Sequence, residues 1–483
     1  MSKPRNILFI TTDQQRRDTL PAYGVEWMQT PNLDRLTREG MTFDNCTAMS
    51  PVCQPARGAF IMGQYPHVTG VGDNFRWIRP ESPTIARLFN EAGWYTAAIG
   101  KMHFHPWDNP EGFQYRVIAE DKRHIFLRDD WTKALEKAGY TRDHPATVPG
   151  YRKDLGAIIS PYPEHLHIDS FIGTEGVRWI EDHAETPFFA WISFNSPHDP
   201  YDPPERLAEL YKNAPIPEAV GSSAEWKSKP KFQHEVVEFY NSNPLFLTNY
   251  YDMTPAQIRK MREYYFATVT LIDEQVGRIL EALERTNQLE NTLIVYSSDH
   301  GDNLGDHGLP FKSNYYEGAL RVPLIVRGPG VRAGKRNGSM VNWVDLHATF
   351  LTVAGVPVPD HVQGTDISAT FESPDLVLKD VAFSELEGSA MVRTNRYKLV
   401  MCDDGSGELY DLTEVPLEVN NHFGEKSFRD VQANLTNMLT RHLLAHSNVR
   451  RFGGGKHESD PERLKAFREI EEKVKDGAFV GLD

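Results

Sequence analysis

The sequence predicts an α/β protein built on a large, mostly parallel sheet with helices on both faces. Short, nearly continuous apolar runs are typical of strands buried on both faces. Such runs occur at residues 6–10, 94–99, 188–194 and 292–296. Segments with helical apolar spacing and clear start signals lie between them, and this alternation is typical of α/β sheets.

Three of the helix starts are marked by a hydroxyl residue followed by proline: Thr30-Pro31, Ser82-Pro83 and Thr254-Pro255. The hydroxyl suits the N-cap and proline suits the first helical position. We expect the first two helices to end at Gly40 and Gly93. A further helix is expected around Pro55, with Gly63 as its stop.

The pattern changes near residue 365, where short strands joined by polar turns precede a helical segment at 429–447. We therefore predict a larger α/β domain at 1–364 and a smaller α+β domain at 365–483. A charged helical tail begins at Asp460, and its apolar residues are spaced by three. Because such a stripe often docks on a neighbour, we expect a homo-oligomer to which the tail contributes.

The bulk composition limits the partners of this protein. A formal net charge of −15 argues against nucleic acid or an anionic membrane as a partner. The first apolar run is too short for a signal peptide, and no stretch approaches the roughly 18 apolar residues of a membrane span. The 3 cysteines cannot form a disulfide framework. We expect a cytoplasmic protein.

Candidate functional side chains follow each predicted strand: Asp13 and Gln14, then Lys101 and His103, then His198, and finally Asp299 and His300. Ligands of open α/β sheets bind beyond the carboxyl ends of the strands. Taken singly, Asp13 and Asp299 could cap helices and Lys101 could lie on the surface. Their joint occurrence favours one site. The later group Asp302, Asp306 and His307 is interpreted as turn residues.

Four of these side chains predict a metal site: Asp13, Gln14, Asp299 and His300. Two carboxylates, an amide oxygen and an imidazole form an oxygen-rich set suited to one divalent cation. The nitrogen ligand favours Mn²⁺ over Ca²⁺ without deciding between them.

The stretch "CQPAR" places Cys53 at a predicted helix amino terminus, where backbone amides favour anions. Arg57 on the same terminus can hold an oxyanion through two donors. By itself, Cys53 could be a small buried hydrophobe or a nucleophilic thiolate of low pKa. Neither interpretation explains the metal set or the additional cations Lys101 and Lys312.

The same stretch matches the signature of the sulfatases, and further segments match that family in its order: "NILFITTDQQRRDTLPAYG", "GKMHFHP", "SPHDPY", "SSDHGDNLGDHGLPFKSNYYEGALRVPLIV" and "RYKLV…GELYDLTEVPLEVNN". The chain therefore resembles the formylglycine-dependent sulfatases of the alkaline phosphatase superfamily, in the branch of arylsulfatases, choline-sulfatases and phosphonate monoester hydrolases.

The resemblance implies an alkaline-phosphatase-like fold and assigns roles by position. Cys53 would be converted to formylglycine, the nucleophile, by a formylglycine-generating enzyme. Arg57 would stabilise it and hold substrate, and Asn74 would contact substrate. Asp13, Gln14, Asp299 and His300 would hold the metal. The sulfate pocket would be lined by Lys101, His103, His198 and Lys312.

The resemblance also implies the activity, which we expect to be hydrolysis of sulfate monoesters of the arylsulfatase type, with promiscuous phosphonate monoester or phosphodiester hydrolysis. The pairs Asp13-Gln14 and Asp299-His300 resemble the phosphonate monoester hydrolases, whereas Lys101 and His103 are more typical of sulfatases. Phosphonate monoester or phosphodiester hydrolysis as the main activity is therefore one alternative. An anion-binding protein that keeps Cys53 unmodified is another.

Overall fold

A computed structural model describes residues 4–242 and 250–447 of the chain. The tail from Asp460, with its expected role in an oligomer, lies outside the described residues, and so does the end of the smaller predicted domain. The domain boundary near residue 365 stays a prediction.

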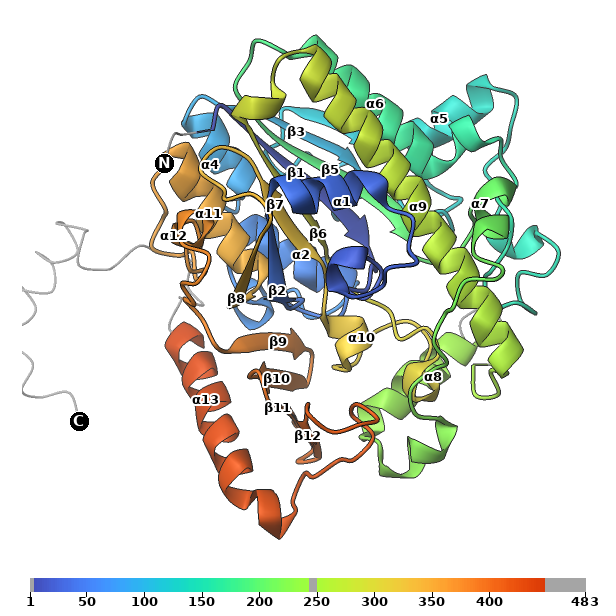
Figure 1. Ribbon diagram of the computed structural model, residues 1–483, viewed down its shortest axis with the longest axis vertical. Coiled ribbons are helices and arrows are strands. Elements are labelled where there is room, and N and C mark those ends of the chain that lie inside the picture. Colours follow the sequence, from blue (N-terminus) through green and yellow to red (C-terminus); the bar gives the residue numbers. More distant parts are fainter. Residues whose placement is uncertain (1–3, 243–249, 448–483) are drawn as a thin grey trace, which may run out of the picture.

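A mostly parallel sheet of 8 strands forms the centre of the molecule, as predicted, and its order is β4-β3-β5-β1-β6-β7-β2-β8 (Figure 1). The strands are β1 (Asn6–Asp13), β2 (Met41–Cys46), β3 (Tyr95–Gly100), β4 (Tyr115–Ile118), β5 (Phe188–Pro197), β6 (Thr292–Ser298), β7 (Leu324–Arg327) and β8 (Lys335–Val341). Strand β7 alone among them runs antiparallel to its neighbours β6 and β2. The four predicted strands are adjacent in the order β3-β5-β1-β6, and all are parallel.

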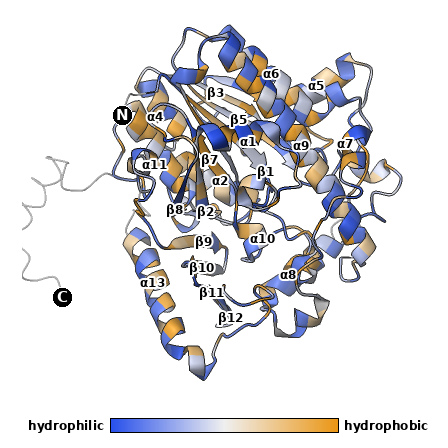
Figure 2. Cartoon of the chain, viewed as in Figure 1, coloured by the Kyte–Doolittle hydropathy of each residue, from blue (hydrophilic) through white to orange (hydrophobic). Residues whose placement is uncertain are grey.

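Helices cover both faces of this sheet because the strands are apolar on both sides. Leu8 and Ile10 of β1 pack on one face with α1 (Pro31–Glu39), α6 (Ile168–Asp182) and α9 (Pro255–Arg285). Ile7 and Phe9 pack on the other face with α2 (Cys53–Met62), α4 (Ile85–Glu91) and α11 (Trp343–Ala354). Figure 2 shows the hydrophobic residues concentrated in these central strands. The remaining helices of this part are α3 (Pro66–Thr69), α5 (Asp130–Lys137), α7 (Glu205–Leu210), α8 (Lys231–Ser242), α10 (Glu317–Leu320) and α12 (Ala369–Glu372).

The helix starts agree with the sequence patterns in part. Thr254 forms a capping box with Gln257 at the start of α9. Thr30 precedes α1, but its hydroxyl makes no capping bond to the backbone, contrary to the expectation. The helix expected to start at Ser82-Pro83 begins two residues later. Thr84, rather than Ser82, caps α4, and its side chain accepts the backbone N–H of Arg87. That helix ends at Glu91, before Gly93.

A second, antiparallel sheet follows the main one in the chain, in the order β12-β11-β10-β9. Its strands are β9 (Ala382–Leu386), β10 (Ser389–Arg393), β11 (Tyr397–Cys402) and β12 (Gly407–Asp411), and α13 (Arg429–Ser447) follows. Leu435 and Leu439 of α13 pack on one face of this sheet. Glu317 of α10 joins it to the main body, because it pairs with Arg393 at 2.8 Å and with Lys398 at 3.2 Å. None of the described helices is both long and apolar enough to span a bilayer.

Phe9 lies at the centre of the aromatic packing between β1, α2 and α11. Its ring centroid is 4.8 Å from that of Phe60, 5.2 Å from that of Trp343 and 5.4 Å from that of Phe350, and the side chain is fully buried. We predict that Phe9→Ala lowers the free energy of unfolding by about 3–5 kcal/mol, because it leaves a cavity among rigid rings. Chemical denaturation followed by tryptophan fluorescence measures this loss.

The matched control is Val415→Ala, since that side chain is 94% exposed. Its effect should stay within about 0.5 kcal/mol. A Phe9→Ala protein as stable as this control would contradict the assignment of Phe9 to the core.

Candidate active site

The side chains predicted at the strand ends meet at one edge of the main sheet. Asp13 is the last residue of β1, Lys101 follows β3, His198 follows β5, and Asp299 follows β6. All four are buried, with at most 3% of their surface exposed. Because these strands are adjacent and parallel, residues nearly 300 positions apart in the chain share one small volume. The structure therefore brings the predicted side chains together at this edge.

Asp13 and Asp299 are held by one guanidinium group. Arg57 donates from Nε to Asp299 Oδ2 (2.9 Å) and from Nη2 to Asp13 Oδ2 (3.2 Å). Its Nη1 donates to the backbone carbonyl of Lys101 (2.6 Å) and to Ser193 Oγ (3.0 Å). Each guanidinium nitrogen of this fully buried side chain therefore has a protein acceptor. Arg57 orients the two carboxylates.

The crowding of acidic groups shows in their pKa values. Burial and the neighbouring Asp13 raise the pKa of Asp299 above its usual value. Burial also raises the pKa of Asp13, but the surrounding cations, Lys101 first among them, outweigh it and hold that pKa well below its usual value. Two carboxylates this close are stabilised by additional positive charge.

These residues fit a divalent cation. One donor atom from each of Asp13, Cys53, Asp299 and His300 lies within 4.8 Å of the others. His300 Nδ1 lies 2.9 Å from the carbonyl oxygen of Gly301, which can only accept, so Nδ1 carries a hydrogen, and when the ring is neutral the lone pair of Nε2 faces the cluster. Nε2 is 3.7 Å from Asp299 Oδ1 and 3.8 Å from Asp13 Oδ1.

Gln14, the fourth predicted ligand, is fixed by hydrogen bonds to both its backbone and its side chain. Its backbone N–H donates to Asp299 Oδ1 (3.1 Å), and its side-chain Nε2 donates to Asp302 Oδ2 (2.6 Å). The amide oxygen is thereby directed to the other side, where it accepts from Lys312 Nζ (2.6 Å). Its φ of 74° is a left-handed conformation that this set of contacts holds in place.

Cys53 is the first residue of α2, as predicted, and its Sγ faces the acidic cluster. Sγ lies 3.1 Å from His300 Nε2, 3.1 Å from Lys312 Nζ and 3.7 Å from Asp13 Oδ1. Burial and Asp13 raise the pKa of Cys53, but Lys312, His300 and a hydrogen bond with His198 outweigh them and leave it well below its usual value. The residue at position 53 therefore sits where a negative charge is stabilised.

Two lysines bring positive charge to the same volume. Lys101 Nζ lies 2.9 Å from Asp13 Oδ2, and Lys312 Nζ lies 4.0 Å from Asp13 Oδ1. Burial lowers the pKa of each lysine, but the neighbouring acidic groups, Asp13 for Lys101 and Cys53 for Lys312, raise it further, so that both stay protonated at neutral pH.

The two predicted histidines are neutral. Burial, followed by Lys101, lowers the pKa of His198 to about 3 and that of His103 to about 4. His198 Nδ1 lies 2.7 Å from the Asp199 carbonyl oxygen, so its Nε2 is the unprotonated nitrogen. His103 Nδ1 is buried without a hydrogen-bond partner among the described residues. Both rings can therefore accept a proton.

Several polar residues around the site were missed by the sequence reasoning. Asp121 Oδ2 lies 3.7 Å from Lys101 Nζ and 2.7 Å from Arg123 Nη2, and Glu120 accepts the backbone N–H of His103 (3.1 Å). These residues follow β4, a short strand that was not predicted. The sequence of β4, YRVI, is only a weak strand signal. If this segment had been predicted as an edge strand, the strand-end rule would have indicated these residues.

Asp302 was assigned to a turn, but it is fully buried and accepts from Gln14 Nε2 and from the hydroxyl of Tyr201 (2.7 Å). Asp302 therefore holds the Gln14 side chain in place.

Asn74 lies beside the site. Its Oδ1 accepts the backbone N–H of Gln54 (3.0 Å), one residue after Cys53.

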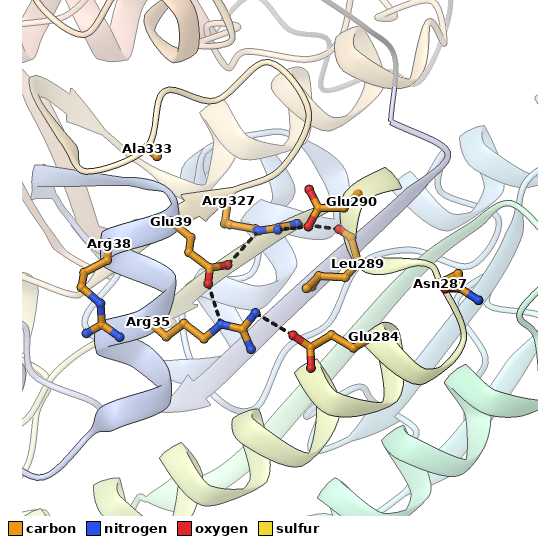
Figure 3. A pocket seen from close by; sticks show the side chains of 9 residues that line it. All are labelled: Arg35, Arg38, Glu39, Glu284, Asn287, Leu289, Glu290, Arg327 and Ala333. Carbon is orange, nitrogen blue, oxygen red and sulfur yellow. Dashed lines mark hydrogen bonds and ion pairs between the residues drawn. The ribbon is translucent and has the colours of Figure 1, made fainter.

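A surface hollow elsewhere in the molecule is lined largely by ion pairs (Figure 3). Arg35 contacts Glu39 at 2.6 Å and Glu284 at 2.7 Å, and Arg327 contacts Glu39 at 3.5 Å. Leu289 and Glu290 on its wall precede β6, so the hollow lies at the end of that strand opposite to Asp299. Its charges are largely paired with each other, and it shares no residue with the strand-end cluster.

Known proteins resemble this chain over most of its length. A choline-sulfatase of Rhizobium meliloti is 29% identical over 99% of this chain and 93% of its own. An arylsulfatase of Clostridium perfringens is 28% identical over 91% of this chain and 94% of its own.

Among solved structures, a phosphonate monoester hydrolase of Silicibacter pomeroyi has the same fold. Its TM-score is 0.80 at 23% identity, over 94% of this chain and 98% of that one. The similarity confirms the predicted alkaline-phosphatase-like architecture.

Family models match as well. The model of the N-sulphoglucosamine sulphohydrolase C-terminal region matches residues 305–444. The sulfatase model matches residues 5–356, well over half of the 483 residues, and this protein therefore belongs to the sulfatase family.

Proposed function

We propose that this protein hydrolyses sulfate monoesters, aryl sulfates among them, with a formylglycine made from Cys53 and one divalent cation. The observation that carries the proposal is the position of Cys53 Sγ, 3.1 Å from both Lys312 Nζ and His300 Nε2 at the start of α2. A nucleophile at this point lies between the cations of the site and the carboxylate pair. A formylglycine-generating enzyme would be required as a partner.

Asp13, Gln14, Asp299 and His300 would hold the cation, as the sequence predicted. When bound, such a cation polarises a sulfuryl oxygen and lowers the pKa of a neighbouring hydroxyl. The hydrated aldehyde of formylglycine offers two hydroxyl groups, so that one can attack sulfur and the second can later expel sulfate and restore the aldehyde. A plain serine or thiolate would need water for that last step.

Charge neutralisation in the transition state falls to Lys101 and Lys312. Both are protonated and buried, and in a site that excludes water such groups stabilise developing charge more strongly than they would in solution. Arg57 contributes through Asp13 and Asp299, which it orients, since its guanidinium donors are already occupied. We assign it a positioning role.

The protonation states of Lys312, His198 and His103 determine which of them can donate a proton and which can accept one. Lys312 carries a proton and lies beside Cys53 Sγ, so we assign it as the donor to the departing alcohol oxygen. His198 and His103 are neutral and accept protons. We assign His103 as the base for the second hydroxyl, because its Nδ1 has no hydrogen-bond partner among the described residues.

Phosphonate monoester hydrolysis as the main activity is the second candidate. The pairs Asp13-Gln14 and Asp299-His300, which resemble those of the phosphonate monoester hydrolases, favour it, and Asn74 beside the start of α2 can hold either monoanionic ester without adding charge. Sulfate and phosphonate monoesters carry one negative charge each, whereas phosphate monoesters approach two at neutral pH. One cation with a few side-chain cations suits monoanions better than dianions.

The first prediction concerns the nucleophile. Mass spectrometry of the peptide that contains Cys53 should show the aldehyde or its hydrate in active protein, and Cys53→Ala should lose all detectable turnover of an aryl sulfate. Cys402→Ser is the control, because Cys402 lies on β11, away from the site, and it should keep wild-type turnover. Full activity from protein that carries only the unmodified thiol would refute the proposal.

The second prediction concerns the metal. Asp299→Asn removes a charged ligand, so the affinity for the catalytic cation should fall by at least about 100-fold. That factor is the upper end of the range for mutations of residues that only hydrogen-bond to metal ligands. Metal analysis after dialysis checks this, with Asp360→Asn on the surface as the control. Stoichiometric cation in the Asp299→Asn protein would overturn the assignment.

The third prediction separates the two candidate reactions. We expect kcat/KM to be measurable for matched aryl sulfate and phosphonate monoester substrates and much lower for the phosphate monoester. Lys101→Ala should reduce the sulfate reaction by about 10²–10³-fold, and Asn74→Ala by less, since a cation stabilises developing charge more than an amide does. Metal content is measured in both variants, because Lys101 also contacts Asp13. A wild-type preference for the phosphate monoester would contradict the monoanion assignment.

A further inference from the structure

A second cluster of metal-ligating side chains lies away from the catalytic cluster, where three elements meet. His67 comes from α3, Glu385 from β9, and His442 from α13. His446 lies one turn further along α13, and residues four apart share a helix face. The cluster therefore joins the helix that follows α2, the second sheet and the last described helix.

Glu385 is the centre of this cluster. Its Oε1 lies 2.9 Å from His67 Nδ1 and 3.2 Å from His442 Nε2, whereas its Oε2 accepts the backbone N–H of His67 (2.9 Å). The donor atoms of His67, Glu385 and His442 all lie within 4.8 Å of one another. The side chains of Glu385 and His442 are only 5% and 2% exposed.

His446 supplies an independent observation. Its Nδ1 is buried and makes no hydrogen bond of good geometry among the described residues, and its nearest acceptor is the backbone of His442 one turn earlier. Its ring lies next to that of His442, with the centroids 4.8 Å apart. A buried imidazole nitrogen without a partner is costly, and a cation beside it would satisfy its lone pair.

We propose that His67, Glu385, His442 and His446 bind one Zn²⁺ ion in a structural site separate from the catalytic centre. Three imidazoles and one carboxylate form a nitrogen-rich donor set of the kind that zinc prefers, in contrast to the oxygen-rich set around Asp13. Four protein ligands leave no open position, as in structural zinc sites.

The donor atoms of His67, Glu385 and His442 lie close enough to share one tetrahedral ion, and His446 would take the fourth position by a change of its side-chain conformation. With Zn–N and Zn–O lengths of about 2.0–2.1 Å, ligand atoms lie about 3.3 Å apart and the centres of ligating imidazole rings lie about 5 Å apart. The imidazole centroids are 4.8 Å apart for His442 and His446, 5.9 Å for His67 and His442, and 6.4 Å for His67 and His446. The ligand-atom contacts at 2.9 and 3.2 Å are a few tenths of an ångström shorter than the tetrahedral edge.

The site would fasten α13 to the part of the chain that carries the nucleophile. Helix α3 begins at Pro66, four residues after α2 ends at Met62. His67 is 26% exposed at its side chain and lines a groove together with Glu385 and Leu443, which gives the ion a path from solvent. Zinc bound there stabilises the folded chain without entering the reaction.

Metal content of the purified full chain tests this. We expect the wild type, purified with zinc present and dialysed, to keep one zinc per chain in addition to its catalytic cation. His446→Ala and the double variant His67→Ala/His446→Ala should bind that zinc at least about 100-fold more weakly and keep the catalytic cation. His165→Ala, which changes an exposed histidine, is the matched control and should keep both ions.

A second measurement covers variants that fold poorly. In the Asp299→Asn protein, where the catalytic site is disabled, added Co²⁺ should give the strong visible absorption of a tetrahedral complex, and excess Zn²⁺ should remove it. The same absorption should be missing when His446→Ala is combined with Asp299→Asn. Equal zinc content in wild type and His446→Ala, or no tetrahedral Co²⁺ spectrum in Asp299→Asn, would refute the site and leave a hydrogen-bonded His–Glu–His cluster. Either result is independent of the reaction proposed for Cys53.

Discussion

The guanidinium group of Arg57 between Asp13 and Asp299 is the contact on which the rest of the site depends. Removing two carboxylates from water costs several kcal/mol each unless they are paired and hydrogen-bonded. Arg57 contacts both from the first helix turn after Cys53, and its remaining nitrogen donates to the backbone of Lys101 after β3 and to Ser193 within β5. A single side chain therefore fixes the nucleophile's helix against four neighbouring strands, β3, β5, β1 and β6.

The same buried setting explains the protonation states around it. Burial, followed by the positive charge of Lys101, keeps His198 and His103 neutral, with pKa values of about 3 and 4. Lysines that donate and histidines that accept can then act in the same small site at one pH. The His67–Glu385–His442–His446 cluster has a different composition. It contains one carboxylate and three imidazoles, and among the described residues no lysine or arginine contacts that carboxylate.

Local sequence patterns predicted much of this arrangement. The four apolar runs became β3, β5, β1 and β6, and the polar residues at or just past their carboxyl ends lie together in the structure, because strand periodicity and the carboxyl-end rule depend only on neighbouring residues. Weak local signals failed. β4 has only four residues with mixed exposure, so Asp121 and Arg123 after it were missed. Thr84 was passed over as a cap in favour of Ser82, since both precede an apolar segment.

By itself, the sequence determined which side chains are available for the chemistry: Cys53 at a helix start, and the acidic, basic and imidazole groups that follow each strand. Only the tertiary structure decided how they pair. The order of the strands made β1 and β6 neighbours, which placed Asp13 and Asp299 close enough to share Arg57. It also turned Asp302 from an expected turn residue into a buried acceptor for Gln14. These pairings join residues about 240 to 290 positions apart, and no periodicity within a segment specifies which distant partner a side chain will meet.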